Sequence, residues 1–253
     1  MRNSFAFLFY LLAFGPAAQA QTLPLINKNV VKINLTDIAL QSYVLQYERV
    51  LGLHSSIALT VGGMFNAPLP FKQTLLNDFG GNSDAKKAIQ TTIFDKQTVT
   101  LEYRFYTGKA APKGFYVAPF ARYMHMSVSQ DYTFTPSDEI LHHAHLNATM
   151  DGFGAGVMIG YQFLIARHFA IDWWIIGPFY GLPMTGHFSG VSNPGFQDMS
   201  ATDHAHLKSD IESVNIPLWK QTATIIDPNQ INVDVKGPYY GVRLMGLCFA
   251  YTF

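Results

Sequence analysis

The sequence predicts an all-β protein: an antiparallel transmembrane β-barrel of about eight strands, with short periplasmic turns and long extracellular loops. Three observations predict this fold. Apolar residues alternate with small or polar residues in one segment after another, which is the period of a β-strand. Charged residues make up only 13% of the 253 residues, too few to cover the outer wall of a soluble barrel, and aromatic residues make up 14%. The predicted connections alternate between short and long, as in outer-membrane barrels.

The N-terminus predicts a cleaved export signal. Arg2 supplies a positive charge, residues 5–14 form an apolar run, and Ala18-Gln19-Ala20 is a small-residue cleavage site that follows a helix-breaking Gly-Pro pair. The apolar run is too short for a membrane-spanning helix, which needs about 20 residues. We therefore expect residues 1–20 to be removed and residues 21–253 to form the barrel domain; an uncleaved N-terminal anchor is the alternative.

The first four predicted strands show the alternation most clearly. They cover residues 30–36, 42–50, 56–65 and 97–106. Their apolar faces comprise Val31, Ile33 and Leu35; Tyr43, Leu45 and Tyr47; Ile57, Leu59, Val61 and Phe65; and Val99, Leu101, Tyr103 and Phe105. The opposite faces carry small residues, polar residues and single charges. Periodicity alone also permits a soluble barrel or sandwich, but such a polar minority face favours a lumen inside a lipid-facing wall.

The last four predicted strands cover residues 115–129, 152–163, 169–179 and 239–253. In residues 152–163, glycines fall on the lumen side and make room for larger neighbours. The final strand places Phe249, Tyr251 and Phe253 on one face, which resembles the C-terminal signal recognised by the outer-membrane barrel assembly machinery. Arg243 falls on the apolar face of this strand. Either it reaches the membrane interface with its long side chain, or a β-bulge resets the face.

The connections divide into two groups. Short turns are expected at about residues 51–55, 107–114 and 165–168. Long extracellular loops are expected at about residues 66–96, 130–149 and 180–236. Within these loops, residues 83–92 predict a short helix with Ser83 as its cap, residues 201–214 have helical character, and residues 220–237 predict a hairpin that extends the barrel wall.

Several stretches carry a resemblance to a known family: VVKINLT (30–36), LQYERVL (45–51), EYRFYTGK (102–109), KGFYVAPFARY (113–123), DWWIIGPFYG (172–181) and GPYYGVRLMGLCFAYTF (237–253). In these stretches the chain resembles a family of uncharacterised Gram-negative outer-membrane β-barrel proteins, classed as a domain of unknown function. The resemblance implies a β-barrel located in the outer membrane. It implies no catalytic residue.

The inferred lumen carries three cations and three anions: Lys32, Arg104 and Arg122, with Glu48, Glu102 and Asp172. Because an eight-stranded barrel is just wide enough for side chains to fill it, these charges are expected to pair as an internal plug. The alternative is a polar conduit for protons or small solutes.

Catalytic and metal-binding patterns are sparse. The sequence contains neither G-x-S-x-G nor H-E-x-x-H. His125 and Ser127 form a candidate pair for a lipid hydrolase at the barrel rim. Histidines that share predicted extracellular loops are candidate metal ligands, although their spacing is not that of a known metal site: His142, His143, His145, His187, His204 and His206. The lone cysteine, Cys248, is expected to be a buried apolar residue.

These observations predict a non-enzymatic outer-membrane barrel that has a structural or surface-binding role through its loops. The alternatives are a lipid-modifying enzyme at the rim and a narrow channel. The expected partners are outer-membrane lipid and the barrel assembly machinery. Because the net charge is zero, nucleic acid is not expected as a partner. No catalytic, cofactor-binding or metal-binding residue is assigned.

Overall fold

The computed structural model describes residues 27–68, 72–79, 86, 89–134, 142–193, 220–227 and 230–253, and the expected signal at residues 1–20 lies outside them. Its elements are β1 (Asn29–Asn34), α2 (Leu35–Ala39), β2 (Tyr43–Val50), β3 (Ser55–Pro68), α3 (Lys72–Phe79), β4 (Ile93–Tyr106), β5 (Gly114–Phe134), β6 (His142–Leu164), β7 (Phe169–Gly181), β8 (Met184–Asn193), β9 (Lys220–Asp227), β10 (Gln230–Gly237) and β11 (Tyr240–Thr252). No helix in these ranges is both long and apolar enough to span a bilayer.

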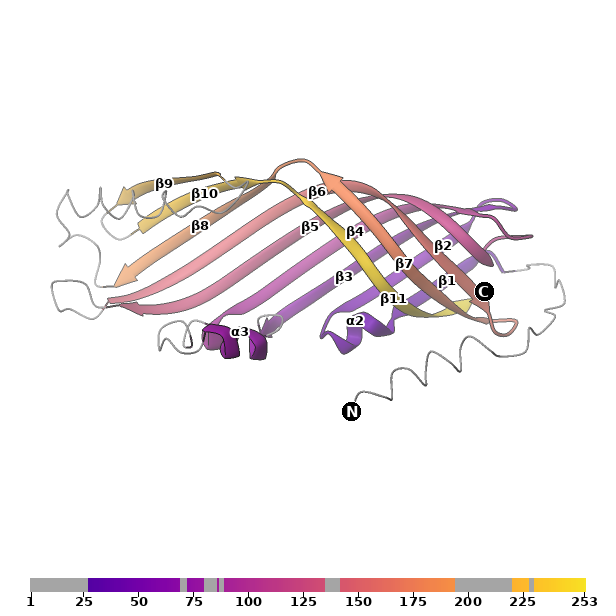
Figure 1. Cartoon of the computed structure of the whole chain (residues 1–253), viewed down its shortest axis with the longest axis horizontal. Coiled ribbons are helices and arrows are strands. Elements are labelled where there is room, and N and C mark those ends of the chain that lie inside the picture. Colours follow the sequence, from indigo (N-terminus) through magenta and orange to yellow (C-terminus); the bar gives the residue numbers. More distant parts are fainter. Residues whose placement is uncertain are drawn as a thin grey trace.

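Eight of these strands close into a ring. They pair in the order β1–β2–β3–β4–β5–β6–β7–β11, and β11 pairs back onto β1. Every pairing is antiparallel, and the closing pair places Val31 opposite Tyr251. The all-β fold and the eight-stranded antiparallel barrel predicted from the sequence are therefore confirmed. Short turns join the strands at the end of the barrel where the C-terminus lies (Figure 1).

Three further strands extend the wall beyond the barrel. Two residues separate β7 from β8, and both strands pair with β6, so β8 continues the course of β7. In the same way β10 leads into β11, pairs with β8 and carries β9 at its outer edge. Figure 1 shows β8, β9 and β10 beside the long ends of β5 and β6, away from the short turns. The hairpin predicted at residues 220–237 is confirmed as β9 and β10.

Much of what the sequence predicted as extracellular loop is strand, and this prediction was wrong. Strand β5 continues to Phe134 and β6 begins at His142, inside the expected loop at 130–149. The expected loops at 66–96 and 180–236 likewise contain the ends of β3 and β4 and all of β8, in addition to the predicted hairpin. The physical reason is a reversal of the two faces: beyond Tyr123 the outer face of β5 becomes polar, with Ser127 and Ser129, so the apolar alternation that marks the ring does not continue while backbone pairing persists.

Two local predictions also differ from the structure. The first strand ends at Asn34 rather than residue 36, because the Asn34 side chain accepts hydrogen bonds from the backbone N–H groups of Thr36 (3.0 Å) and Asp37 (3.1 Å). Asn34 thereby caps α2. In the loop after β3, the helix α3 precedes the predicted helix at 83–92; within that range, residues 86 and 89–91 are helical. The segment 201–214 lies outside the described residues.

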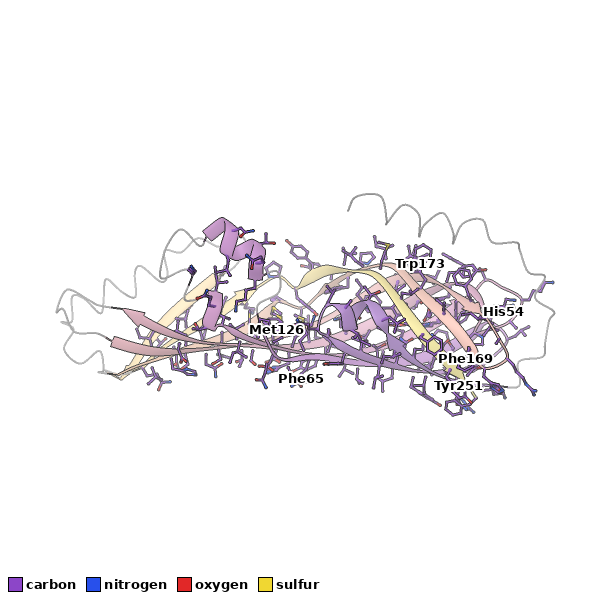
Figure 2. All side chains as sticks on the ribbon, turned by 90° about the horizontal axis from the view of Figure 1, so that it is seen from below. His54, Phe65, Met126, Phe169, Trp173 and Tyr251 are labelled. Atoms are coloured by element: carbon purple, nitrogen blue, oxygen red, sulfur yellow. The ribbon has the colours of Figure 1, made fainter. Side chains whose placement is uncertain are left out.

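The outer surface of the ring is apolar and rich in aromatic side chains. Phe169 contacts both Phe249 and Tyr251, with ring centroids 5.6 Å apart in each case. Figure 2 shows Phe169 and Tyr251 near the end that carries His54, with Phe65 farther along the wall. Exposed apolar side chains on the eight ring strands include Val31, Ile33, Leu45, Tyr47, Leu59, Val61, Val99, Leu101, Tyr103, Phe105, Tyr123, Phe153, Val157, Phe163, Phe169, Ile176, Val242, Leu247, Phe249 and Tyr251.

The inner surface fits large side chains against glycines, as predicted for residues 152–163. A Cβ on Gly160 would collide with the Tyr116 hydroxyl and would lie 2.7 Å from the Trp173 carbonyl oxygen. A Cβ on Gly156 would lie 2.8 Å from the Phe120 ring. The expected burial of Cys248 is also confirmed. The barrel is therefore filled, and its centre is polar rather than apolar.

Candidate functional site

The centre of the barrel holds a network of buried charges. Lys32 of β1 lies at the end of this network nearest the short turns. The Lys32 Nζ lies 2.5 Å from Glu48 Oε2 and 2.6 Å from Asp172 Oδ2. It also donates a hydrogen bond to Gln162 Oε1 at 2.7 Å. Alternation along β1, β2, β6 and β7 turns these four side chains inward, where each is fully buried.

Arg104 of β4 joins this group to a second carboxylate. Its Nη1 donates to Asp172 Oδ2 at 2.7 Å, and its Nη2 donates to Glu102 Oε2 at 2.7 Å and to Gln46 Oε1 at 2.9 Å. The guanidinium carbon lies 4.4 Å from the centre of the Tyr116 ring. Such a planar cation, with several fixed donors, suits a buried site that must satisfy several acceptors at once.

Arg243 of β11 completes the network at the end farther from the short turns. Its Nη1 donates to Glu102 Oε1 at 2.7 Å, and its guanidinium lies between the rings of Phe120 and Trp174, 5.1 Å and 4.7 Å from their centres. The sequence left two alternatives for Arg243: a side chain that reaches the membrane interface, or a change of face along the strand. The structure shows the change of face. Leu244 and Met245 are both exposed, so two successive residues point outward and Arg243 then points inward.

Hydroxyl and indole groups satisfy the remaining carboxylate oxygens. Tyr106 donates to Glu48 Oε1 at 2.7 Å, and Ser56 donates to the same oxygen. Tyr116 donates to Asp172 Oδ1 at 2.9 Å, and the Trp174 indole N–H lies 3.2 Å from Asp172 Oδ2. Three cations thus face three anions, with side chains that are 0–7% exposed. A balanced, hydrogen-bonded set of this kind fills the centre of the lumen, and the network itself carries no net charge.

Five of the six residues predicted for the lumen network lie in it: Lys32, Glu48, Glu102, Arg104 and Asp172. The sixth, Arg122, does not, and Arg243 takes its place. Arg122 faces inward but lies nearer the outer mouth, where its charged neighbours are Arg243 and Asp37, with Tyr239 beside it. Alternation along a strand predicts whether a side chain faces inward or outward, but not where it lies along the barrel axis. Arg122 is separated from the network by its position along that axis.

Helix α2 follows β1 and contacts β11 and β2. Asp37 of this helix interacts electrostatically with the cations Lys96, Arg122 and Arg243. Burial raises the pKa of the Asp37 carboxyl above its usual value, while these three positive charges oppose the rise. The helix therefore adds one anion above the network, on the side where Arg122 lies.

The histidines expected in loops lie on strands where the structure describes them. His145 lies 2.8 Å from Asp131 and His187 lies 2.6 Å from Asp234, in each case from Nδ1 to a carboxylate oxygen. His125, which was predicted on a strand, lies 2.9 Å from Asp151 in the same way. The backbones of His142 and His143 belong to β6, whereas His204 and His206 lie outside the described residues. Within the described part of the chain, no group of three potential ligands could hold a metal ion.

The architecture defines the class of protein: a closed eight-stranded barrel with an apolar outer wall and a charge-filled interior. The chain belongs to the family described as "Protein of unknown function (DUF3575)", whose model matches residues 6–185. The resemblance found in the sequence is thereby confirmed. The chain is also similar to the crystal structure of a major outer membrane protein from Thermus thermophilus, with 17% identity, coverage of 90% of this chain and 100% of that chain, and a TM-score of 0.37. No curated protein matches the chain.

Proposed function

We propose that this protein is an outer-membrane barrel with a structural or surface-binding role, in which the barrel anchors a sheet that projects outside the cell. The apolar outer wall carries this proposal. On β5 it runs for nine residues, from Phe115 to Tyr123, and on β6 for eleven, from Phe153 to Phe163. Transmembrane strands need about 9–11 residues to cross the hydrocarbon layer. The remaining parts of β5 and β6 then lie beyond the lipid.

The lumen supports a closed barrel rather than a channel. The cationic nitrogens of Lys32, Arg104 and Arg243 lie 2.5–2.7 Å from oxygens of the three carboxylates. The charged groups that would line a conduit are therefore bonded to one another. An ion that entered would have to break these contacts in a space already filled by aromatic rings. We therefore propose that the network seals the barrel and holds its strands together.

The end of the wall with the short turns supports contact with lipid. In the turns and adjoining strand ends there, at residues 27–29, 49–55, 107–114 and 165–168, the charged side chains are all cationic: Lys28, Arg49, Lys109, Lys113 and Arg167. They lie just beyond the lower aromatic side chains, at the level where phosphate headgroups of the periplasmic leaflet are expected. During biogenesis, the terminal strand with Phe249, Tyr251 and Phe253 is proposed to engage the barrel assembly machinery.

Fractionation and conductance test the proposal. The protein should be recovered with the outer membrane and should migrate faster on a gel when unheated than when boiled, because a folded barrel resists detergent. In planar bilayers it should give no steady open current. Recovery in the soluble periplasm would contradict the membrane assignment. Steady open currents, in turn, would contradict the sealed lumen and favour the narrow channel.

A further inference from the structure

The extension sheet carries a row of polar side chains on its outer face, above the apolar wall. Along β5 the outward residues after Tyr123 are His125, Ser127, Ser129 and Asp131. Across from them on β6 lie Asp151, Thr149, Asn147 and His145, respectively. This pairing brings together residues that are 14 and 16 positions apart in the chain. The sequence alone predicted a strand that ends at residue 129 and a loop over residues 130–149, and so did not place these residues opposite one another.

Three of these side chains are connected in a nucleophile–base–acid order. The Ser129 Oγ lies 3.3 Å from His145 Nε2, and His145 Nδ1 lies 2.8 Å from Asp131 Oδ1. When Asp131 accepts a hydrogen bond from Nδ1–H, the unprotonated Nε2 can accept a hydrogen bond from the Ser129 hydroxyl. This is the arrangement in which a serine is activated by a histidine that a carboxylate orients. We propose that Ser129, His145 and Asp131 form an ester-hydrolysing site on the outer face of the sheet.

The chemistry needs no co-reactant except water. Ser129 Oγ attacks the carbonyl carbon of an ester while His145 Nε2 takes the hydroxyl proton. When the tetrahedral intermediate collapses, the ester C–O bond breaks and the leaving alkoxide receives that proton from His145. Water, deprotonated by His145, then attacks the acyl-serine, releases the carboxylic acid and restores Ser129. Asp131 holds the imidazole in the productive tautomer and stabilises its positive charge throughout.

A donor for the developing oxyanion stands next to the nucleophile. Asn147 lies directly opposite Ser129 on β6, and cross-strand partners have Cβ atoms about 4.5–5.5 Å apart. The amide N–H of an asparagine is among the groups that stabilise such an oxyanion. On the other side of His145, its partner on β8 is Val191, which is exposed and offers a small apolar contact for an acyl group.

The position of the site selects a short acyl ester on a polar molecule. Ser129 lies six residues beyond Tyr123 on β5, about 20 Å along the strand at a rise of about 3.3 Å per residue. The long acyl chains of membrane lipids lie below that level. This placement rests on the proposed function, which puts the sheet outside the membrane. The proposed site also differs from the rim pair His125 and Ser127 that the sequence suggested. Within the described residues, His125 bonds to Asp151, and Ser127 makes no hydrogen bond to His125.

The site is tested with the purified full-length protein in detergent, using a fluorophosphonate probe and p-nitrophenyl acetate and butyrate. We expect the intact mass to rise by one adduct, which peptide mapping assigns to Ser129. Ser129→Ala should abolish labelling, and His145→Ala should lower the hydrolysis rate by about 100-fold or more. Asn147→Ala should lower kcat more than it raises KM, because an oxyanion donor acts in the transition state.

Matched controls lie on the same strand. Ser127→Ala removes a hydroxyl from the same face two residues away, and His125→Ala removes a histidine bonded to an aspartate in the same way; both should keep the wild-type rate. Labelling at Ser127, or hydrolysis that survives Ser129→Ala, would overturn the inference. A folded, heat-modifiable outer-membrane barrel that is neither labelled nor active would overturn the inference alone, whereas recovery of the protein in the periplasm would overturn the proposed function.

Discussion

Removal of the Glu102 carboxylate is the sharpest test of the lumen network. Glu102 accepts hydrogen bonds from Arg104 at 2.7 Å and from Arg243 at 2.7 Å, and it is fully buried. Glu102→Ala leaves three buried cations facing two anions. Loss of one partner from a buried ion pair costs about 3–5 kcal/mol, because the other charge stays desolvated without compensation. We expect the free energy of unfolding to fall by an amount in this range.

Equilibrium unfolding in urea, with the protein in lipid vesicles and the folded fraction read from heat-shifted gel mobility, measures the change. With a slope of about 2 kcal/mol per molar urea, the midpoint should fall by about 1.5–2.5 M. Asp234→Ala is the control, since this carboxylate is 67% exposed and pairs only with His187 in the described part of the chain. Exposed substitutions usually move stability by no more than about 0.5 kcal/mol.

A double mutant separates charge balance from lost packing. Glu102→Ala combined with Arg243→Ala restores two cations and two anions, so its cost should be smaller than the sum of the two single costs. If the costs simply add, the two residues do not form a coupled pair. If Glu102→Ala unfolds at the wild-type midpoint, the network does not stabilise the barrel, and the reasoning from buried charge is wrong.

Three further outcomes are expected. Gly160→Ala should lower the yield of folded barrel, because its Cβ would collide with the Tyr116 hydroxyl. Gly190→Ala is the control and should fold as the wild type, because its Cβ would meet one flexible leucine side chain at 3.1 Å. Heat-shifted gel mobility measures the folded fraction of both variants. Deletion of Phe253 should reduce assembly in the outer membrane, because its backbone N–H and C=O bond to Asn29 and close the ring. Unchanged assembly after that deletion would count against its role in closure.

The sequence predicted the ring part of the fold well, for a physical reason. On the clearest ring strands apolar side chains face outward and small, polar or charged side chains mostly face the filled lumen, so the alternation is strong; residues 97–106 and 169–179 fall within β4 and β7. In the extension the two faces are reversed: Ser127 and Ser129 follow Tyr123 on the outer face of β5, while Met126 and Val128 lie on the opposite face. The apolar alternation of the ring therefore ends there, and residues 142–149 are predicted as loop although they pair with β5.

The candidate sites were predictable to different degrees for the same reason. Lumen charges such as Glu102 and Arg104 stand out because a charge is rare on an otherwise regular strand. The Ser129–His145–Asp131 set depends on the register between β5 and β6, which the sequence does not reveal. A sequence signal exists only in part: Ser129 and Asp131 are two residues apart, as on one face of a strand, but nothing in the chain indicates which histidine faces them.

The exchange of Arg122 for Arg243 shows what charge counting cannot decide. Either arginine gives three cations against three anions, so neutrality is satisfied by both. The choice is made by backbone geometry: Leu244 and Met245 both point outward, and the pairing of β6 with β7 shifts at the same level, between Ile159 and Gly160. Without that irregularity, Arg243 would face outward and Glu102 would lose one of its two arginines. The change of face on β11 therefore specifies the network, and a strand that alternated perfectly to the C-terminus would leave the network one cation short.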